Sequence, residues 1–110
     1  MGQISFDDFQ KVDIRVGKII KVEDFPKANR PAYKLAIDFG EFGIKNSSAR
    51  ITHKYAKGKL LGRLVIAVTN FPPKQVADFM SEVLVLGVVT DEGVVLLNID
   101  EPVKLGSKIA

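Results

Sequence analysis

The chain has 110 residues, a length that fits one domain spanning residues 1–110. Apolar residues make up 46% of it, enough for a packed core, and the absence of cysteine excludes disulfides, thiolate nucleophiles and cysteine-based metal sites. No run approaches the ~18 apolar residues of a membrane span. Met1 to Asp8 lacks the basic and apolar regions of a secretion signal. The composition therefore predicts a cytoplasmic protein with no membrane insertion.

The net charge of +3 is unevenly distributed along the chain. Residues 1–41 carry seven basic and seven acidic side chains, whereas residues 42–77 carry seven Lys or Arg and no acid. Residues 78–110 carry six acids and two lysines. A chain polarised in this way can present a positive face to a polyanion. The same cations could instead be solvated loop charges that point in several directions.

The first half of the chain is predicted to form a helix and three strands. Ser5 is a good N-cap and acids follow it, which indicates a short helix at about 5–10. Apolar side chains alternate over 12–22, which predicts a long, half-buried strand with a bulge at Gly17. The remaining elements follow in order: a loop at 24–31, a strand at 33–39, a reversal at 40–43 and a third strand at about 43–48.

The second half is predicted to contain a helical connection and further strands. Thr52 as a cap and Gly58 as a stop indicate one or two helical turns at 52–57. The continuous apolar run at 64–68 predicts a strand that is buried on both sides. Beyond it we expect a loop at 71–73, strands at 83–89 and 94–99, and a last short strand within 100–110.

A helical element between the third and fourth strands is typical of the five-stranded Greek-key oligonucleotide-binding (OB) fold. The order of elements therefore predicts an all-β OB-fold barrel with short helices and extended N- and C-terminal segments. Other small barrels and α+β sandwiches are the alternatives that the pattern leaves open.

Residues typical of catalysis are scarce. His53 is the only histidine, so neither a histidine-based metal cluster nor a triad with a spare base can form. Adjacent acidic pairs such as Asp91-Glu92 stand at segment ends, where neighbouring side chains point apart. No phosphate-binding loop, dinucleotide fingerprint or nucleophile elbow is present. We therefore expect a protein that is not an enzyme and that holds no metal or cofactor.

The acid-free stretch supplies candidates for nucleic-acid binding. Its cations lie on or beside predicted loops, where they can reach phosphates: Lys45, Arg50, Lys54, Lys57, Lys59, Arg63 and Lys74. The string Asn70-Phe71-Pro72-Pro73 differs, because an aromatic ring beside a stiff proline pair offers a rigid apolar surface. Such a surface suits an unfolded peptide as well as a base.

Several strings occur together in an order and spacing that resembles the tRNA-binding-domain family: residues 12–19, 25–28, 47–49, 68–73 and 81–87. That family includes the C-terminal extension of bacterial methionyl-tRNA synthetase and free-standing dimeric relatives. Within the family, the strings at 70–73 and 81–87 are similar to those of the protein-export chaperone branch. The resemblance covers about residues 6–108. It implies an OB barrel whose terminal segments build a two-fold homodimer.

The resemblance also implies a site. In the tRNA-binding relatives, polar side chains near the third strand, an Asn after the fourth and a Ser-x-Gly-Met string line a nucleic-acid site. These positions correspond here to Ser47, Ser48, Asn70 and Ser81, and the Gly and Met are replaced by Val83 and Leu84. The family's usual His-Pro-x-Ala-Asp-Lys-Leu loop is replaced by residues 25–31, which begin with Phe25 instead of His. These departures favour the more apolar chaperone branch.

Two hypotheses follow. The first is a dimeric chaperone for unfolded preproteins, for which the resemblance implies the export ATPase as a further partner; its expected contacts are Phe71, Pro72, Pro73, Asn29, Arg30, Ser47, Ser48 and Asn70. The second is a tRNA-binding module of translation or tRNA handling; its expected contacts are Arg30, Lys45, Arg50, Lys54, Lys57, Asn70 and Ser81. Salt distinguishes them, because phosphate binding falls steeply with salt whereas apolar binding changes little.

Overall fold

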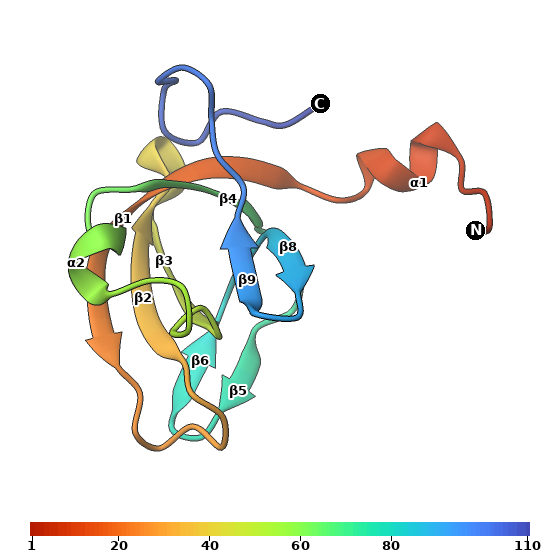
Figure 1. Ribbon diagram of the computed structural model, residues 1–110. Helices are drawn as coiled ribbons and strands as arrows, with labels where there is room; N and C mark the ends of the chain where they lie inside the picture. Colours follow the sequence, from red (N-terminus) through yellow and green to blue (C-terminus); the bar gives the residue numbers. More distant parts are fainter.

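Five antiparallel strands form a sheet that curls into a nearly closed barrel in the computed structural model, which describes all of residues 1–110 (Figure 1). The strands lie in the order β3-β2-β1-β4-β7. Their bounds are β1 (Ile14–Asp24), β2 (Tyr33–Asp38), β3 (Ile44–Ala49), β4 (Leu64–Val68) and β7 (Leu84–Val85). The predicted all-β, five-stranded OB-type barrel is thereby confirmed.

The remaining elements are short. They are the helices α1 (Phe6–Gln10) and α2 (Lys57–Leu60), the 3-10 turn η1 (Gly40–Phe42), the hairpin β5 (Lys74–Val76) with β6 (Phe79–Ser81), and the hairpin β8 (Gly87–Thr90) with β9 (Gly93–Leu96). No helix has the length and apolar character needed to cross a membrane.

The barrel closes along a seam between β3 and residues 81–83, which begin at the end of β6. The Ser48 N–H donates to Ser81 Oγ at 3.0 Å, and the Glu82 N–H donates to the Asn46 carbonyl at 2.8 Å. The hydroxyl of Ser47 donates to the Val83 carbonyl at 2.8 Å inside the barrel. These bonds use polar groups that would otherwise be left unpaired at a sheet edge.

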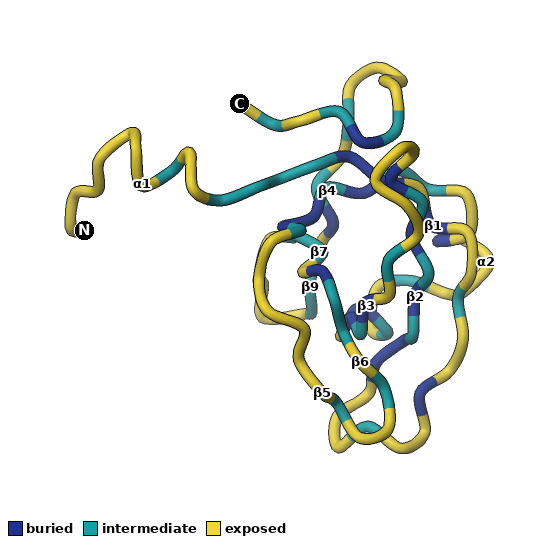
Figure 2. The backbone as a smooth tube through the Cα atoms, turned by 180° about the vertical axis from the view of Figure 1, so that it is seen from behind, coloured by how far each residue is buried: buried dark blue, intermediate teal, exposed yellow.

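The core fills the barrel, as the buried segments in Figure 2 show. In β2 the odd-numbered residues Tyr33, Leu35 and Ile37 point inward, because successive side chains of a strand alternate between faces. Phe39, which is 1% exposed, follows them into the core. Burial of such side chains contributes roughly 1.5–3 kcal/mol each.

The bulge in β1 lies at Ile20 and not at Gly17, so the predicted position was wrong. The pairing of β1 with β2 shifts register between Ile19 and Lys21, whereas Gly17 pairs regularly with Val65. Gly17 has a different role: a Cβ there would lie 2.5 Å from Cγ2 of Ile37. The glycine is therefore needed for close packing inside the barrel.

Three other boundaries differ from the prediction. The helix is 57–60, after an extended Ala56, and Gly58 lies within it. The strand expected at 83–89 is interrupted at Leu86, whose N–H donates to the Ile66 carbonyl. The segment 100–110 contributes only an isolated bridge between Lys108 and Arg15. The hairpin at 74–81 was not predicted at all.

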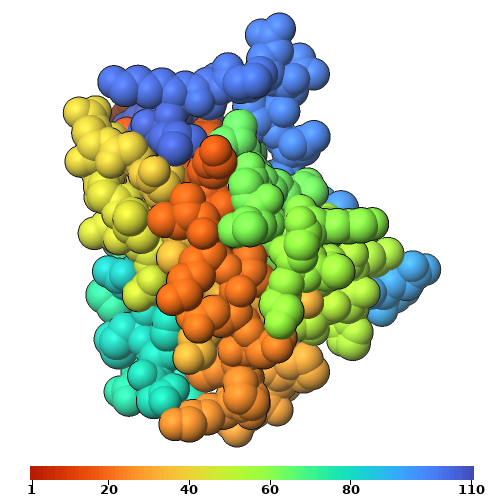
Figure 3. All heavy atoms as spheres, turned by 90° about the vertical axis from the view of Figure 1, so that its left-hand side faces the viewer, coloured from red at the N-terminus to blue at the C-terminus, as the bar shows by residue number.

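Both terminal segments extend from the barrel. Ser5 is the N-cap of α1, as the sequence indicated, and it forms a capping box with Asp8. The helix α1 projects away from the barrel and has no buried residue (Figures 1 and 2). The C-terminal segment lies across β1 at the top of the barrel (Figure 3). Its Gly106 N–H donates to the Val16 carbonyl, and the Val16 N–H donates to the Ser107 carbonyl.

Candidate functional site

A groove of about 1020 Å³ lies between the β1–β2 loop and the β5–β6 hairpin. Residues 27–30 form one wall, residues 74–77 form the other, and residues 48–51 and 81–87 lie between them. OB folds bind ligands on the face bounded by the loop after the first strand and the loop after the fourth. The groove occupies that position, because the β5–β6 hairpin is inserted after β4.

Local features of the chain shape both walls. Pro26 and Pro31 keep the first wall out of the sheet, since proline cannot donate to a strand ladder. The second wall is a hairpin whose tip contains Ala77 with a φ of 53°. The Gln75 side chain donates to the Ala77 carbonyl at 3.1 Å and stabilises this tip.

The surface of the groove combines apolar and polar groups. Phe71 and Val89 are 51% and 85% exposed and offer apolar surface to a ligand, as does the half-exposed Leu84. Ser48 and Gln75 supply polar groups beside them. A mostly apolar concavity with a few polar groups is typical of a binding site for an extended chain or a small ligand.

The charge around the groove is positive. Arg30, Arg50 and Lys74 line it, and none of them forms an ion pair. The acidic residue in its lining is Glu82, whose Oε1 accepts a hydrogen bond from the Asn46 N–H at 2.9 Å. A fourth cation of the lining, Lys27, forms an ion pair with Asp78, which is not itself a lining residue. The groove therefore favours a ligand that carries some negative charge.

The Lys27–Asp78 pair shifts both pKa values. The 2.8 Å hydrogen bond between Nζ and Oδ2 raises the pKa of the Lys27 amine and lowers the pKa of the Asp78 carboxyl. Each shift favours the charged form of its group, so both groups are charged across the physiological range.

Seven of the thirteen residues predicted to contact a peptide or an RNA lie together in this groove. They are Asn29, Arg30, Ser48, Arg50, Phe71, Pro72 and Ser81. Ser48 and Ser81 are joined through the hydrogen bond that closes the barrel, so the seam itself forms part of the groove.

The other predicted contacts lie elsewhere. Ser47 is 1% exposed and belongs to the core, and Pro73 stands outside the lining. Lys45 lines a separate cavity of about 230 Å³ beside Arg15. Lys54 and Lys57 pair with Glu92 at 3.2 Å and Asp24 at 2.7 Å, respectively, and the hydrogen bond to Asp24 raises the pKa of Lys57.

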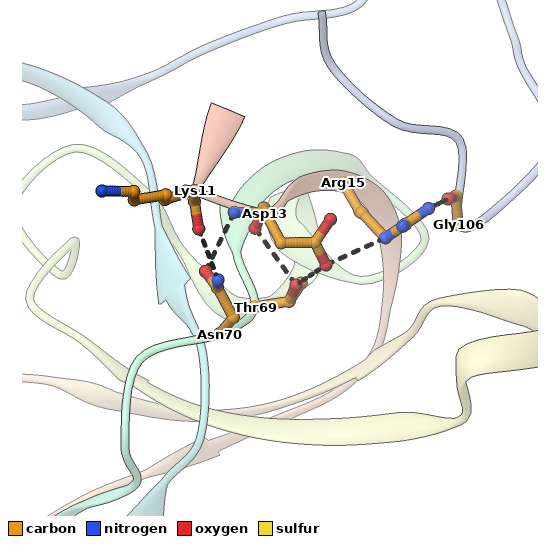
Figure 4. A network of polar contacts seen from close by, with 6 residues as sticks. All are labelled: Lys11, Asp13, Arg15, Thr69, Asn70 and Gly106. Carbon is orange, nitrogen blue, oxygen red and sulfur yellow. Dashed lines mark hydrogen bonds and ion pairs between the residues drawn. The ribbon is translucent and has the colours of Figure 1, made fainter. Parts of the chain in front are cut away.

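Asn70 belongs to a polar network that fixes both terminal segments to the barrel (Figure 4). Its Nδ2 donates to the Lys11 carbonyl at 2.7 Å. Thr69 donates to the Asp13 carboxylate at 2.5 Å, and this bond, with the Arg15 guanidinium beside it, holds the pKa of Asp13 below its ordinary 3.8. Arg15 also donates to the Gly106 carbonyl at 2.9 Å. The network is structural, because its groups point at one another.

Part of the groove was not predicted from the sequence. Val76, Ala77, Val89 and Val94 line it, and none of them was singled out. The hairpin residues carry no glycine or asparagine turn signal, so no pattern marked them. Lys74 was recognised as a cation of the acid-free stretch, but not as part of a wall.

Comparison with known proteins gives a consistent result. Residues 14–108 match the family described as "Putative tRNA binding domain". The methionine–tRNA ligase of Thermococcus kodakarensis is 38% identical over 109 residues, which cover 99% of this chain and 14% of that enzyme. The chain thus spans about one seventh of the length of such an enzyme.

Two crystal structures of the chaperone CsaA share the fold over almost their full length. The protein from Bacillus anthracis strain Ames has a TM-score of 0.94 and 47% identity, with 99% of this chain and 100% of that chain covered. The protein from Picrophilus torridus has a TM-score of 0.93 and 56% identity, with 98% and 100% covered. With its sequence motifs, the OB-type barrel and the family match in agreement, this chain belongs to the tRNA-binding-domain family.

Proposed function

We propose that this chain is an export-related molecular chaperone, which binds extended segments of unfolded preproteins in the groove and catalyses no reaction. The observation that carries this proposal is the lining of the groove, where exposed apolar side chains such as Phe71 and Val89 are combined with cations and amides of the two walls. An extended peptide matches such a surface, since its side chains alternate and its backbone can use the polar rim. The likeness to two CsaA chaperones supports the same assignment.

A tRNA-binding role is the second candidate, and one observation favours it. Arg30, Arg50 and Lys74 line the groove without acidic partners, so they are available to phosphates. The positions of three other predicted contacts argue against this role. Lys45, Lys54 and Lys57 lie outside the groove, and the last two form ion pairs. We therefore place peptide binding first.

Paired titrations test the assignment. Purified protein is titrated with a chemically unfolded preprotein and with unfractionated tRNA, each at low and at physiological salt. Under the proposal, the preprotein affinity changes little with salt, whereas tRNA affinity falls steeply because counterions are released from phosphates. Tight tRNA binding at physiological salt without binding of the unfolded chain would reverse the order of the two functions.

Substitutions locate the site in the same titrations. Phe71→Ala should weaken preprotein binding, and Arg50→Glu should weaken tRNA binding more than preprotein binding. Lys59→Glu is the matched control, since Lys59 is an unpaired cation of the same acid-free stretch outside the groove. Equal losses in Arg50→Glu and Lys59→Glu would mean that general charge, and not the groove, attracts the RNA.

The chain is further proposed to act in the cytoplasm as a two-fold homodimer with the export ATPase as a partner. Support for the dimer comes from the projecting N-terminal arm, defined as residues 1–10, where Ile4 and Phe6 are 73% and 70% exposed. Exposed apolar surface of this kind is typical of an interaction site. Light scattering should show a dimer that Phe6→Ser weakens, whereas Leu61→Ser should leave it intact, since Leu61 is an exposed leucine that follows α2 on the barrel.

A further inference from the structure

The two walls of the groove are joined by one cluster of side chains, here named the clamp: Phe25, Lys27, Lys34, Asp78 and Phe79. Phe25 and Lys27 belong to the β1–β2 loop, Lys34 to β2, and Asp78 and Phe79 to the tip of the β5–β6 hairpin. In Figures 1 and 3 this hairpin lies beside the β1–β2 loop at the lower end of the barrel. The clamp thus connects segments that are about fifty residues apart, as the 51-residue separation of Lys27 and Asp78 shows.

The clamp has an aromatic part and an ionic part. The rings of Phe25 and Phe79 meet edge to face with centroids 5.6 Å apart, a geometry that aromatic pairs favour. The Lys34 amine lies 5.2 Å from the first centroid and 5.6 Å from the second, within the range of a cation–π interaction. Lys27 and Asp78 add the 2.8 Å ion pair.

A single polar contact of the clamp attaches the hairpin tip to the rest of the barrel. Among all hydrogen bonds and ion pairs of residues 74–80, only the bond between Lys27 and Asp78 reaches a residue outside the hairpin. The next attachment is at Ser81, where the hairpin returns to β3. Without the clamp, the tip would be free to move away from the loop, because a two-stranded hairpin is only marginally stable by itself.

From these contacts we infer that the clamp holds the two walls at a fixed separation in the unbound protein, and that its members are positioning residues for the ligand. This inference rests on the function proposed above for the groove. A preformed groove avoids the entropy cost of ordering a mobile wall when the ligand binds. Phe25 is central to it, since it is 4% exposed and stands where the family usually has a histidine.

A distance measurement tests the clamp without any ligand. The protein has no cysteine, so Asn29→Cys and Met80→Cys place spin labels on the loop and on the hairpin alone. We expect a narrow distance distribution in the otherwise unchanged protein and a broader one in Asp78→Asn. The charge swap of Lys27→Asp with Asp78→Lys should make it narrow again, because the ion pair is restored with reversed sign.

Binding of the chemically unfolded preprotein tests the positioning role. Its Kd should rise about threefold in Asp78→Asn, the scale of one exposed ion pair, and should recover in the charge swap. Glu23→Gln is the control. It breaks the exposed ion pair between Lys21 and Glu23, whose charged atoms are 3.5 Å apart, and neither residue lines the groove, so the substitution should change neither the distance distribution nor the Kd.

The outcomes separate the two proposals. A distance distribution that stays narrow in both Asp78→Asn and Phe79→Leu overturns the clamp. A distribution that broadens without any change in Kd overturns the positioning role. Failure of the unaltered protein to bind the preprotein contradicts the proposed function, and in that case the spin-label distances still decide whether the clamp exists.

Discussion

Asn70 fixes the backbone of Asp13: its Oδ1 accepts a hydrogen bond from the Asp13 N–H at 2.9 Å, across 57 residues of sequence. The same side chain donates to the Lys11 carbonyl, so both the oxygen and the nitrogen of its amide form hydrogen bonds. The residue that the family resemblance places in a ligand site therefore anchors the N-terminal arm to the end of β4. The motif that continues into Phe71 and Pro72 thus combines a structural anchor with part of the groove lining.

Asn70→Ala should loosen the root of the N-terminal arm. Two hydrogen bonds are lost and two backbone groups lose their partners, which predicts a loss of about 1–2 kcal/mol in the free energy of unfolding. Hydrogen exchange should increase at residues 11–13. The control is Asn98→Ala, an exposed asparagine without a hydrogen bond, which should stay within about 0.5 kcal/mol of the parent. Equal effects of the two substitutions would contradict the anchor.

The Asp13 carboxylate should make stability depend on pH in the acid range. Hydrogen bonding to Thr69, and then to Arg15, lowers its pKa below the ordinary 3.8. A carboxyl whose pKa is lower in the folded than in the unfolded state stabilises the fold above the unfolded value, and this stabilisation is lost as pH falls through the folded value.

Denaturant unfolding at about pH 6 and about pH 3 checks this dependence. The parent protein should lose more stability over that interval than Asp13→Asn, which has no carboxyl to protonate. Glu101→Gln removes an exposed acid without an ion pair and should follow the parent. Thr69→Val should raise the pKa of Asp13 toward its ordinary value, and an unchanged carboxyl titration by NMR would argue against this cause.

The sheet was largely predictable because its strands carry periodic patterns. Alternation predicted β2 nearly to the residue, because one face of that strand is buried. The apolar run predicted the bounds of β4, but the expected burial of both its faces was wrong, since Leu64 and Ile66 are only partly buried. The β5–β6 hairpin has no comparable signal: its turn is Ala77-Asp78, without the Gly or Asn that such turns favour. Its position depends on the clamp, which connects distant parts of the chain and leaves no local pattern.

The groove was predictable only in part, for a physical reason that the cations illustrate. Lys54 and Arg50 look alike in the sequence, yet Lys54 pairs with Glu92, 38 residues away, whereas Arg50 has no acidic partner. The absence of acids within a stretch of sequence does not exclude acidic partners from distant segments, because folding can bring such segments beside its cations. Ser47 and Ser48 differ for a second reason, because neighbours on a strand face opposite sides, and only Ser48 faces the groove.

Gly17→Ala should destabilise the barrel through overpacking. The added Cβ would lie 2.5 Å from Ile37 Cγ2 and 2.7 Å from Phe39 Cε1, both on buried side chains. A clash of this kind in a packed core costs about 1–3 kcal/mol in the free energy of unfolding. The contrast is Gly58→Ala, where no atom lies within 4 Å and the helix should gain about 0.5–1 kcal/mol. Similar effects of both substitutions in denaturant unfolding would contradict the packing argument.

Ala77→Gly should stabilise the tip of the groove's second wall. Ala77 has a φ of 53°, in the left-handed region where a Cβ costs roughly 1–2 kcal/mol. Glycine removes this strain but enlarges the entropy of the unfolded chain, so we expect a net gain of about 0.5–1 kcal/mol.

Such a gain corresponds to a rise in Tm of a few degrees, on the scale of about 4–8 °C per kcal/mol. Ala36→Gly is the matched control: Ala36 lies inside β2 and has no positive φ, so glycine there should lower Tm. If both substitutions lowered Tm alike, the hairpin tip would hold no strain. If Ala77→Gly alone raised it, the left-handed turn would be retained at a cost in stability. Since Ala77 lines the groove, this backbone strain would lie in the wall that the ligand contacts.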